Sequence, residues 1–125
     1  MLPMATRVLI LEPDEDVLFV ITEYLRRTTD FDCESATSGQ QCIDMLDRFR
    51  PDVLVMEPSL PCDSSGQILD AIASAPGRPY LPVLVLTRLN RDPTRELHSS
   101  ISEYLVKPQS LDKIVDAIRR LTSAN

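Results

Sequence analysis

The sequence predicts an α/β fold in which a doubly wound, five-stranded parallel sheet is covered by helices on both faces. Two observations carry this prediction. Short apolar runs typical of strands alternate five times with segments of helical periodicity along the 125 residues, which is the pattern of repeated βα units. Several of these runs are continuously apolar, as expected for parallel strands buried on both faces. We expect a single domain over residues 1–125, with no effector domain after Asn125.

The first two βα units occupy residues 7–50. Residues 7–11 are the first predicted strand, which is apolar throughout from Val8 to Leu11, and the helix that follows starts near Asp14. Residues 31–36 are a weaker and therefore peripheral strand, and Ser38 is the candidate N-cap of the second helix, which Pro51 ends. The apolar helical positions are Val17, Leu18, Ile21, Tyr24 and Leu25 in the first helix and Cys42, Ile43, Met45, Leu46 and Phe49 in the second.

The remaining units follow the same plan. The third strand covers residues 53–56, and a helix carrying Ile68, Leu69 and Ile72 continues until Pro76-Gly77. The fourth strand covers residues 81–86 and the fifth residues 103–106, with a short helix predicted near Asp92-Pro93 between them. Ser110 opens the last helix. Its apolar positions are Leu111, Ile114, Val115, Ile118 and Leu121.

Composition and charge exclude several classes of function. The formal charge is −6, from 19 acidic and 13 basic residues, and the basic residues are scattered, so we expect no direct nucleic-acid binding. No apolar stretch approaches the roughly 18 residues that span a bilayer, and the first residues do not form a secretion signal. We therefore expect a cytoplasmic protein. Cys33, Cys42 and Cys62 form no Cys-x-x-Cys pair, and we interpret them as reduced thiols.

Four polar residues follow directly after four of the predicted strands. Glu12 follows the first, Glu57 the third, Thr87 the fourth and Lys107 the fifth. In an open α/β sheet, ligands bind beyond the carboxyl ends of the strands, near the point where the strand order reverses. The sequence therefore predicts that these side chains converge on one site.

This arrangement resembles bacterial response-regulator receiver domains over the whole chain. The matches are the acid after strand one, the loop Glu57-Pro58-Ser59-Leu60-Pro61 after strand three, Thr87, and Lys107-Pro108, with Tyr104 at the family's aromatic switch position. The resemblance implies a flavodoxin-like sheet of order 2-1-3-4-5. It also implies a non-enzymatic phosphorelay domain whose partners are proteins, either a sensor kinase or a downstream signalling protein.

Two departures from the family pattern concern phosphorylation and metal binding. Glu57 stands where the family has its phosphoacceptor aspartate. The family holds Mg²⁺ with two acids after strand one and the acceptor, because Mg²⁺ takes octahedral oxygen ligands. Glu12 replaces the first of these acids, but Pro13 replaces the second. Glu12 and Glu57 are therefore the candidate metal ligands, and the resemblance implies weakened Mg²⁺ binding.

The roles of Asp14 and Glu57 each have two interpretations. Asp14 either joins Glu12 in an acidic pocket or, as favoured by its position at the helix start, caps that helix. Glu57 either forms a permanent ion pair with Lys107 in place of phosphate and metal, or points into solvent.

We interpret the chain as a degenerate receiver that acts through protein–protein interaction. One alternative is a functional receiver that is phosphorylated at an unusual acceptor. The other is a small flavodoxin-like cofactor-binding protein, which the acidic loop at residues 12–16 opposes because such proteins bind an anionic phosphate there.

Overall fold

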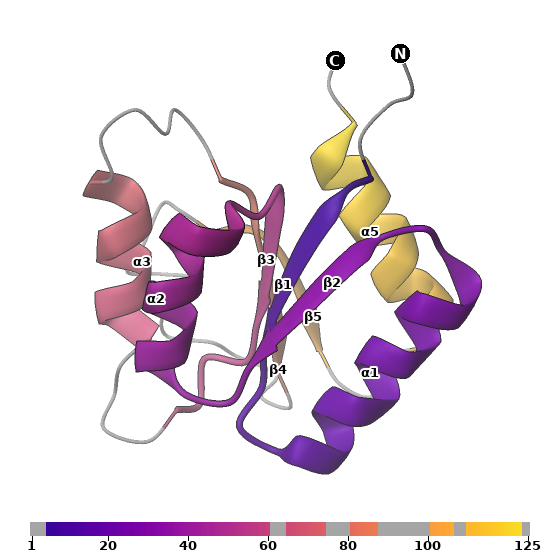
Figure 1. Ribbon diagram of the computed structural model, residues 1–125, viewed down its shortest axis with the longest axis horizontal. Helices are drawn as coiled ribbons and strands as arrows, with labels where there is room; N and C mark the ends of the chain where they lie inside the picture. Colours follow the sequence, from indigo (N-terminus) through magenta and orange to yellow (C-terminus); the bar gives the residue numbers. More distant parts are fainter. Residues whose placement is uncertain (1–4, 61–64, 75–80, 88–100, 107–109, 124–125) are drawn as a thin grey trace.

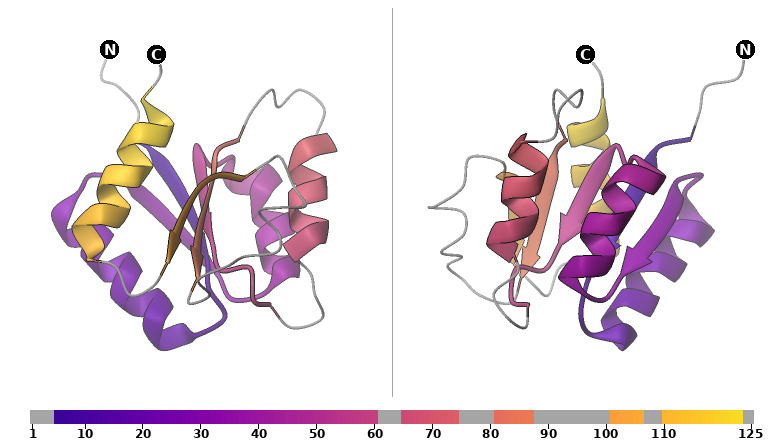
Figure 2. Two further views of the ribbon diagram at one scale, coloured as in Figure 1. Left: turned by 180° about the vertical axis from the view of Figure 1, so that it is seen from behind. Right: turned by 60° about the vertical axis from the view of Figure 1, so that its left-hand side comes forward.

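A five-stranded parallel sheet lies between two layers of helices (Figure 1). The computed structural model describes residues 5–60, 65–74, 81–87, 101–106 and 110–123. Helices α1 and α5 cover one face of the sheet, and α2 and α3 cover the other (Figure 2). The elements are β1 (Arg7–Leu11), α1 (Glu15–Thr28), β2 (Asp32–Ala36), α2 (Gly39–Phe49), β3 (Val53–Met56), α3 (Ser65–Ser74), β4 (Val83–Thr87), β5 (Ile101–Val106) and α5 (Leu111–Thr122).

The strand order is β2-β1-β3-β4-β5, and every neighbouring pair is parallel. This order confirms the predicted doubly wound topology, including the peripheral position of β2. Because the chain leaves β1 for β2 on one side and returns to β3 on the other, the strand order reverses at β1 and β3. The carboxyl ends of these two strands are therefore where a ligand crevice is expected.

Side chains of the central strands alternate between two apolar clusters, one on each face of the sheet. On β3, Val53 and Val55 pack with α1 and α5, whereas Leu54 and Met56 pack with α2 and α3. All four are buried. This double burial explains why the predicted strands are continuously apolar.

The predicted ends of three strands differ from those observed. β4 starts at Val83 rather than residue 81. Pro82, which has no N–H, contributes only its carbonyl, which accepts the Leu54 amide at 3.0 Å. β5 starts at Ile101 rather than residue 103, with a register irregularity between Val83 and Leu84 of its neighbour β4. β2 starts one residue later than predicted.

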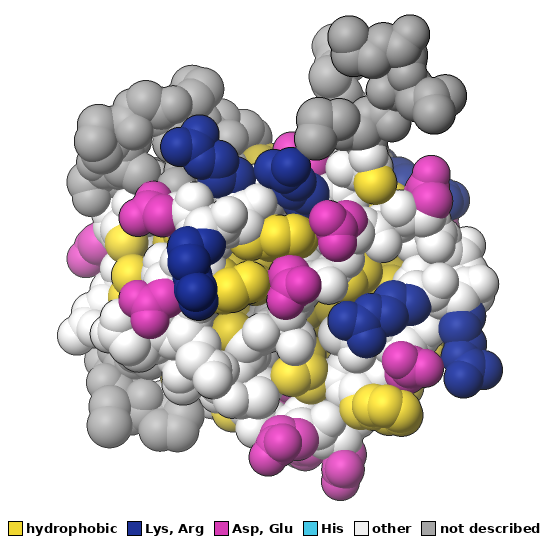
Figure 3. Space-filling view, viewed as in Figure 1, with side chains coloured by type: hydrophobic (Ala, Val, Ile, Leu, Met, Phe, Trp, Pro, Cys, Tyr) yellow, Lys and Arg dark blue, Asp and Glu magenta, His cyan; other side chains and the backbone are white. Residues whose placement is uncertain are grey.

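Several sequence predictions fall outside the described residues. These are the short helix near Asp92-Pro93, the helix end at Pro76-Gly77, and the positions of Cys62 and Lys107. Within the described ranges, none of the helices combines the length and apolar composition needed to cross a bilayer. On the face shown in Figure 3, basic side chains lie among acidic ones, and on α1 Arg26 and Arg27 both pair with Glu23.

Candidate functional site

The carboxyl ends of β1, β3 and β4 bring Glu12, Glu57 and Thr87 to one edge of the sheet. Leu11 is in register with Met56, so Glu12 and Glu57 each follow a paired residue on neighbouring strands, which lie about 4.8 Å apart. Met56 is in register with Val85, two residues before Thr87. The convergence predicted for these three residues is therefore confirmed for their backbone positions.

Glu57 is buried, with only 7% of its surface exposed. Its backbone amide extends the strand ladder by donating to the Leu11 carbonyl at 3.0 Å. Its side-chain Oε2 accepts a hydrogen bond from the Ser59 amide at 2.9 Å. The interpretation that Glu57 points into solvent is therefore wrong, because its carboxylate is folded back into the turn that follows β3.

Glu12 has the same arrangement at the end of β1. It is 4% exposed, and its amide donates to the Ala36 carbonyl of β2 at 3.0 Å. Its Oε2 accepts the Asp14 amide at 3.0 Å. Burying a carboxylate is costly unless hydrogen bonds compensate for the lost water, and in both glutamates a turn amide provides part of that compensation.

Asp14 is the N-cap of α1. Its side chain is exposed, and Oδ1 accepts the amides of Asp16 at 3.0 Å and Val17 at 3.3 Å. The capping interpretation is confirmed. The assignment of the Asp14 carboxylate to the acidic pocket is wrong, because that carboxylate is exposed and accepts amides of the first helical turn, while it is the Asp14 backbone amide that donates to Glu12.

We predict that Asp14→Ala lowers the free energy of unfolding by about 1 kcal/mol through loss of the cap. Asp14→Asn is the matched control, since asparagine caps about as well as aspartate, and it is expected to retain most of the stability. Urea denaturation measures both. Equal losses in the two variants would show that the charge of Asp14, rather than capping, stabilises the protein.

Of the three remaining site residues, the structure places Thr87 and Tyr104 on their strands but does not describe Lys107. Thr87 is fully buried at the end of β4 and is in register with Val106. Tyr104 lies on the edge strand β5, in register with Val85. Lys107 lies outside the described residues, so its ion pair with Glu57 stays a prediction.

The acidic side chains at this edge do not form the set of three carboxylates with which the family binds Mg²⁺. Glu12 and Glu57 each commit one carboxylate oxygen to an amide, Pro13 has no carboxylate, and Asp14 caps α1. Among the described residues, no three His, Cys, Asp or Glu side chains are grouped to hold a metal ion. The described site therefore does not fit Mg²⁺ coordination of the family type.

The buried cysteines belong to the core, as the sequence indicated. Cys33 packs in the cluster beneath α1 and α5, and Cys42 in the cluster beneath α2 and α3. Burial raises the pKa of Cys33 to about 11 and that of Cys42 to about 12. Because the thiolate is the reactive form, neither thiol is an effective nucleophile near neutral pH.

Sequence reasoning missed the turn amides of Asp14 and Ser59 as partners of the two glutamates. A signal for them is present in the sequence, because Glu-Pro occurs after both β1 and β3. The repeated dipeptide points to two similar turns, but only the folded chain shows which amide each carboxylate accepts.

Comparison with known proteins identifies relatives over nearly the whole chain. The family model of the response regulator receiver domain matches residues 8–119. The transcriptional regulatory protein TrcR of Mycobacterium tuberculosis is 32% identical over 117 residues, which cover 92% of this chain and 44% of TrcR. The chain spans about half the length of such relatives.

Solved structures show the same fold. The response regulator domain of Thermotoga maritima CheB superimposes with a TM-score of 0.81 at 17% identity, covering 98% of this chain and 99% of that domain. The receiver domain of a Pseudomonas aeruginosa sensor histidine kinase, which has a magnesium ion in its active-site cleft, gives a TM-score of 0.79. It is 23% identical, and the match covers 97% of this chain and 100% of that one.

Proposed function

The chain belongs to the response regulator receiver domain family, and we propose that it is a degenerate member, which signals by binding proteins and is not switched by ordinary aspartyl phosphorylation. Its partners in this proposal are a sensor kinase or a downstream signalling protein of a two-component system. The family assignment leaves the cofactor-binding alternative without support.

The observation that carries this proposal is the buried Glu57 carboxylate. Glutamate is one methylene longer than aspartate, which moves its carboxylate outward by about 1.5 Å, the length of one C–C bond. In addition, Oε2 is held by the Ser59 amide. Phosphoryl transfer depends mainly on positioning and electrostatic stabilisation, so a displaced and hydrogen-bonded carboxylate is a poor acceptor.

The end of β1 supports the same conclusion. In many enzymes that transfer phosphoryl groups, metal ions neutralise the negative charge that develops during the reaction. With Pro13 in place of the second acid and Asp14 committed to α1, the described residues give little support for binding a metal ion. Glu57 retains a fixed negative charge, about half that of a phosphoryl group, which suits a site whose state does not depend on a phosphodonor.

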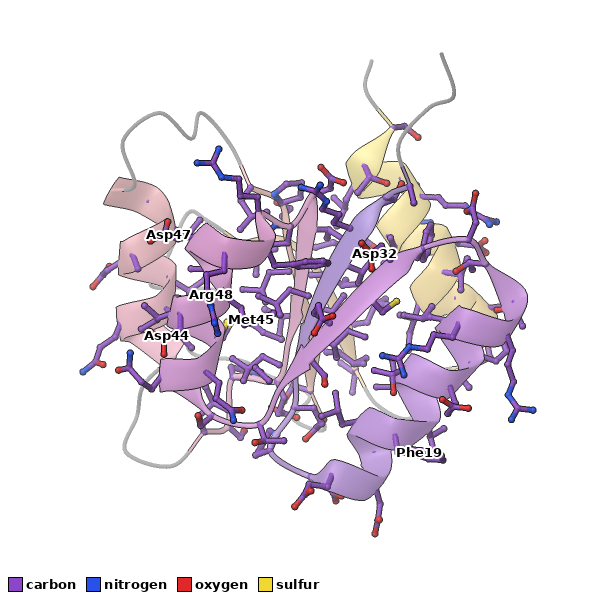
Figure 4. The ribbon with its side chains drawn as sticks, in the orientation of Figure 1. Phe19, Asp32, Asp44, Met45, Asp47 and Arg48 are labelled. Atoms are coloured by element: carbon purple, nitrogen blue, oxygen red, sulfur yellow. The ribbon has the colours of Figure 1, made fainter. Side chains whose placement is uncertain are left out.

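Helix α1 offers a surface that supports protein binding. Phe19 and Val20, in the second turn of α1, are 64% and 53% exposed, and Figure 4 shows Phe19 on the outer side of α1. Aromatic side chains are enriched in the cores of protein interfaces. The neighbouring Glu15 and Asp16 are also exposed, so a partner that contributes basic residues would complement this helix.

Intact-mass measurement tests the proposal. After incubation with a small phosphodonor and Mg²⁺, the native protein is expected to keep its mass, while a receiver with an aspartate acceptor gains one phosphoryl group under the same conditions. A mass gain in the native protein that is lost in Glu57→Gln would contradict the proposal and identify Glu57 as an unusual acceptor. A gain retained in Glu57→Gln would contradict it equally and point to another acceptor.

A further inference from the structure

The two glutamates of the site lie in matching turns, which we call the Glu-Pro turns and define as residues 12–14 and 57–59. In each turn the glutamate ends a strand, a proline follows, and the amide of the third residue donates back to the glutamate Oε2. The distances are 3.0 Å from Asp14 and 2.9 Å from Ser59. The same short motif thus occurs on two adjacent strands of the sheet.

Proline has two effects on such a turn. It has no N–H, so the first amide available to the glutamate carboxylate is that of the third residue. Its ring also fixes φ near −65°, which reduces the number of backbone conformations that the turn can adopt. Pro58 is itself buried and Pro13 half-buried. These constraints favour the folded-back carboxylate that the structure shows.

The turns also determine which amides are available at this edge. Successive backbone N–H groups in a turn are natural binding groups for anions such as phosphate. Here positions 13 and 58 have no N–H, and the amides of Asp14 and Ser59 already donate to carboxylates. The glutamates therefore occupy, as part of the chain, amides that an external anion would otherwise use.

We propose that Pro13 and Pro58 are positioning residues, which hold Glu12 and Glu57 as internal anions and so close this edge of the sheet to external phosphate groups. The inference deepens the proposed function and rests on it for its biological meaning. It adds a physical reason why the site does not use a phosphodonor, namely that the receiving amides are occupied.

Amide hydrogen exchange of Ser59 tests the role of Pro58. In Pro58→Ala, residue 58 gains an N–H that competes for Glu57 and loses its fixed φ. The exchange rate of the Ser59 amide is expected to rise about five-fold, the factor for one hydrogen bond of ordinary net strength. Pro51→Ala, at the other end of β3, is the matched control and is expected to leave the Ser59 rate unchanged.

The Leu54 amide, which is bonded to the Pro82 carbonyl, reports on opening of the sheet in the same samples. If Ser59 exchanges equally in Pro58→Ala and Pro51→Ala, or if Leu54 accelerates as much as Ser59, the positioning role is overturned. A double-mutant cycle adds a second criterion. In a Glu57→Gln background, which keeps an acceptor oxygen but loses the charge, Pro58→Ala is expected to have a smaller effect on Ser59, and an undiminished effect contradicts the inference.

Titration with inorganic phosphate tests closure of the edge separately. The Ser59 and Asp14 amide resonances of the native protein are expected not to shift, and a saturable shift would overturn the closure. These results are independent of the mass measurement. Phosphorylation of the native protein would contradict the proposed function but would not change the exchange result. Fast Ser59 exchange in the native protein would contradict only the positioning role of Pro58.

Discussion

The double variant Pro13→Asp/Glu57→Asp is expected to accept one phosphoryl group from a small phosphodonor in the presence of Mg²⁺, unlike the native protein. The two substitutions restore an acceptor of the family's length at the end of β3 and a second acid beside Glu12 at the end of β1. Together with Glu12, they recreate the three-carboxylate set that suits an octahedral Mg²⁺ ion. Intact mass with and without a chelator measures the gain and its dependence on the metal.

The two single variants are the matched controls. Pro13→Asp retains the displaced Glu57 carboxylate, and a misplacement of about 1 Å can slow a reaction on the order of 100-fold. Glu57→Asp retains Pro13 and lacks the second acid, so it is expected to react more slowly than the double variant. If the double variant gains no mass while its fold is intact, Glu57 and Pro13 are not the main reasons for the loss of phosphorylation.

Replacing Leu54 by alanine is expected to lower the free energy of unfolding by about 3 to 5 kcal/mol. Leu54 has no exposed surface, and it lies on β3 in register with Leu9 of β1 and Val83 of β4. Truncation there removes buried apolar surface and leaves a cavity that a sheet with neighbours on both sides cannot easily fill. Since domains are typically stable by about 5 to 15 kcal/mol, this is a large part of the total, and urea denaturation measures it.

Val20→Ala is the contrasting variant, because Val20 is 53% exposed on α1. Its expected effect on the free energy of unfolding is within about 0.5 kcal/mol. Similar losses in Leu54→Ala and Val20→Ala would mean that the packing around β3 contributes far less than its burial indicates.

Most of the fold could be predicted from the sequence because its determinants are local. The apolar periodicity of α1 predicted the buried positions Leu18, Ile21 and Leu25, and the structure confirms them. Ser38 caps α2 through the Gln41 amide, as its position before the helical pattern indicated. Periodicity and capping depend on neighbours within one or two turns of the chain, so they can be recognised without knowing the tertiary structure.

For the candidate site, local sequence pattern predicted the backbone positions of the residues but not the contacts of their side chains. The sequence by itself placed Glu12, Glu57 and Thr87 at strand ends, since strand boundaries follow from local pattern. Tertiary structure decided that Glu57 is buried rather than solvated, that Asp14 contributes an amide and not a carboxylate, and that β5 begins at Ile101. The physical reason is that burial and strand pairing depend on segments far apart in the chain. The Glu57 carboxylate loses its water and bonds to a turn amide only because the folded β1, β3 and β4 bury it.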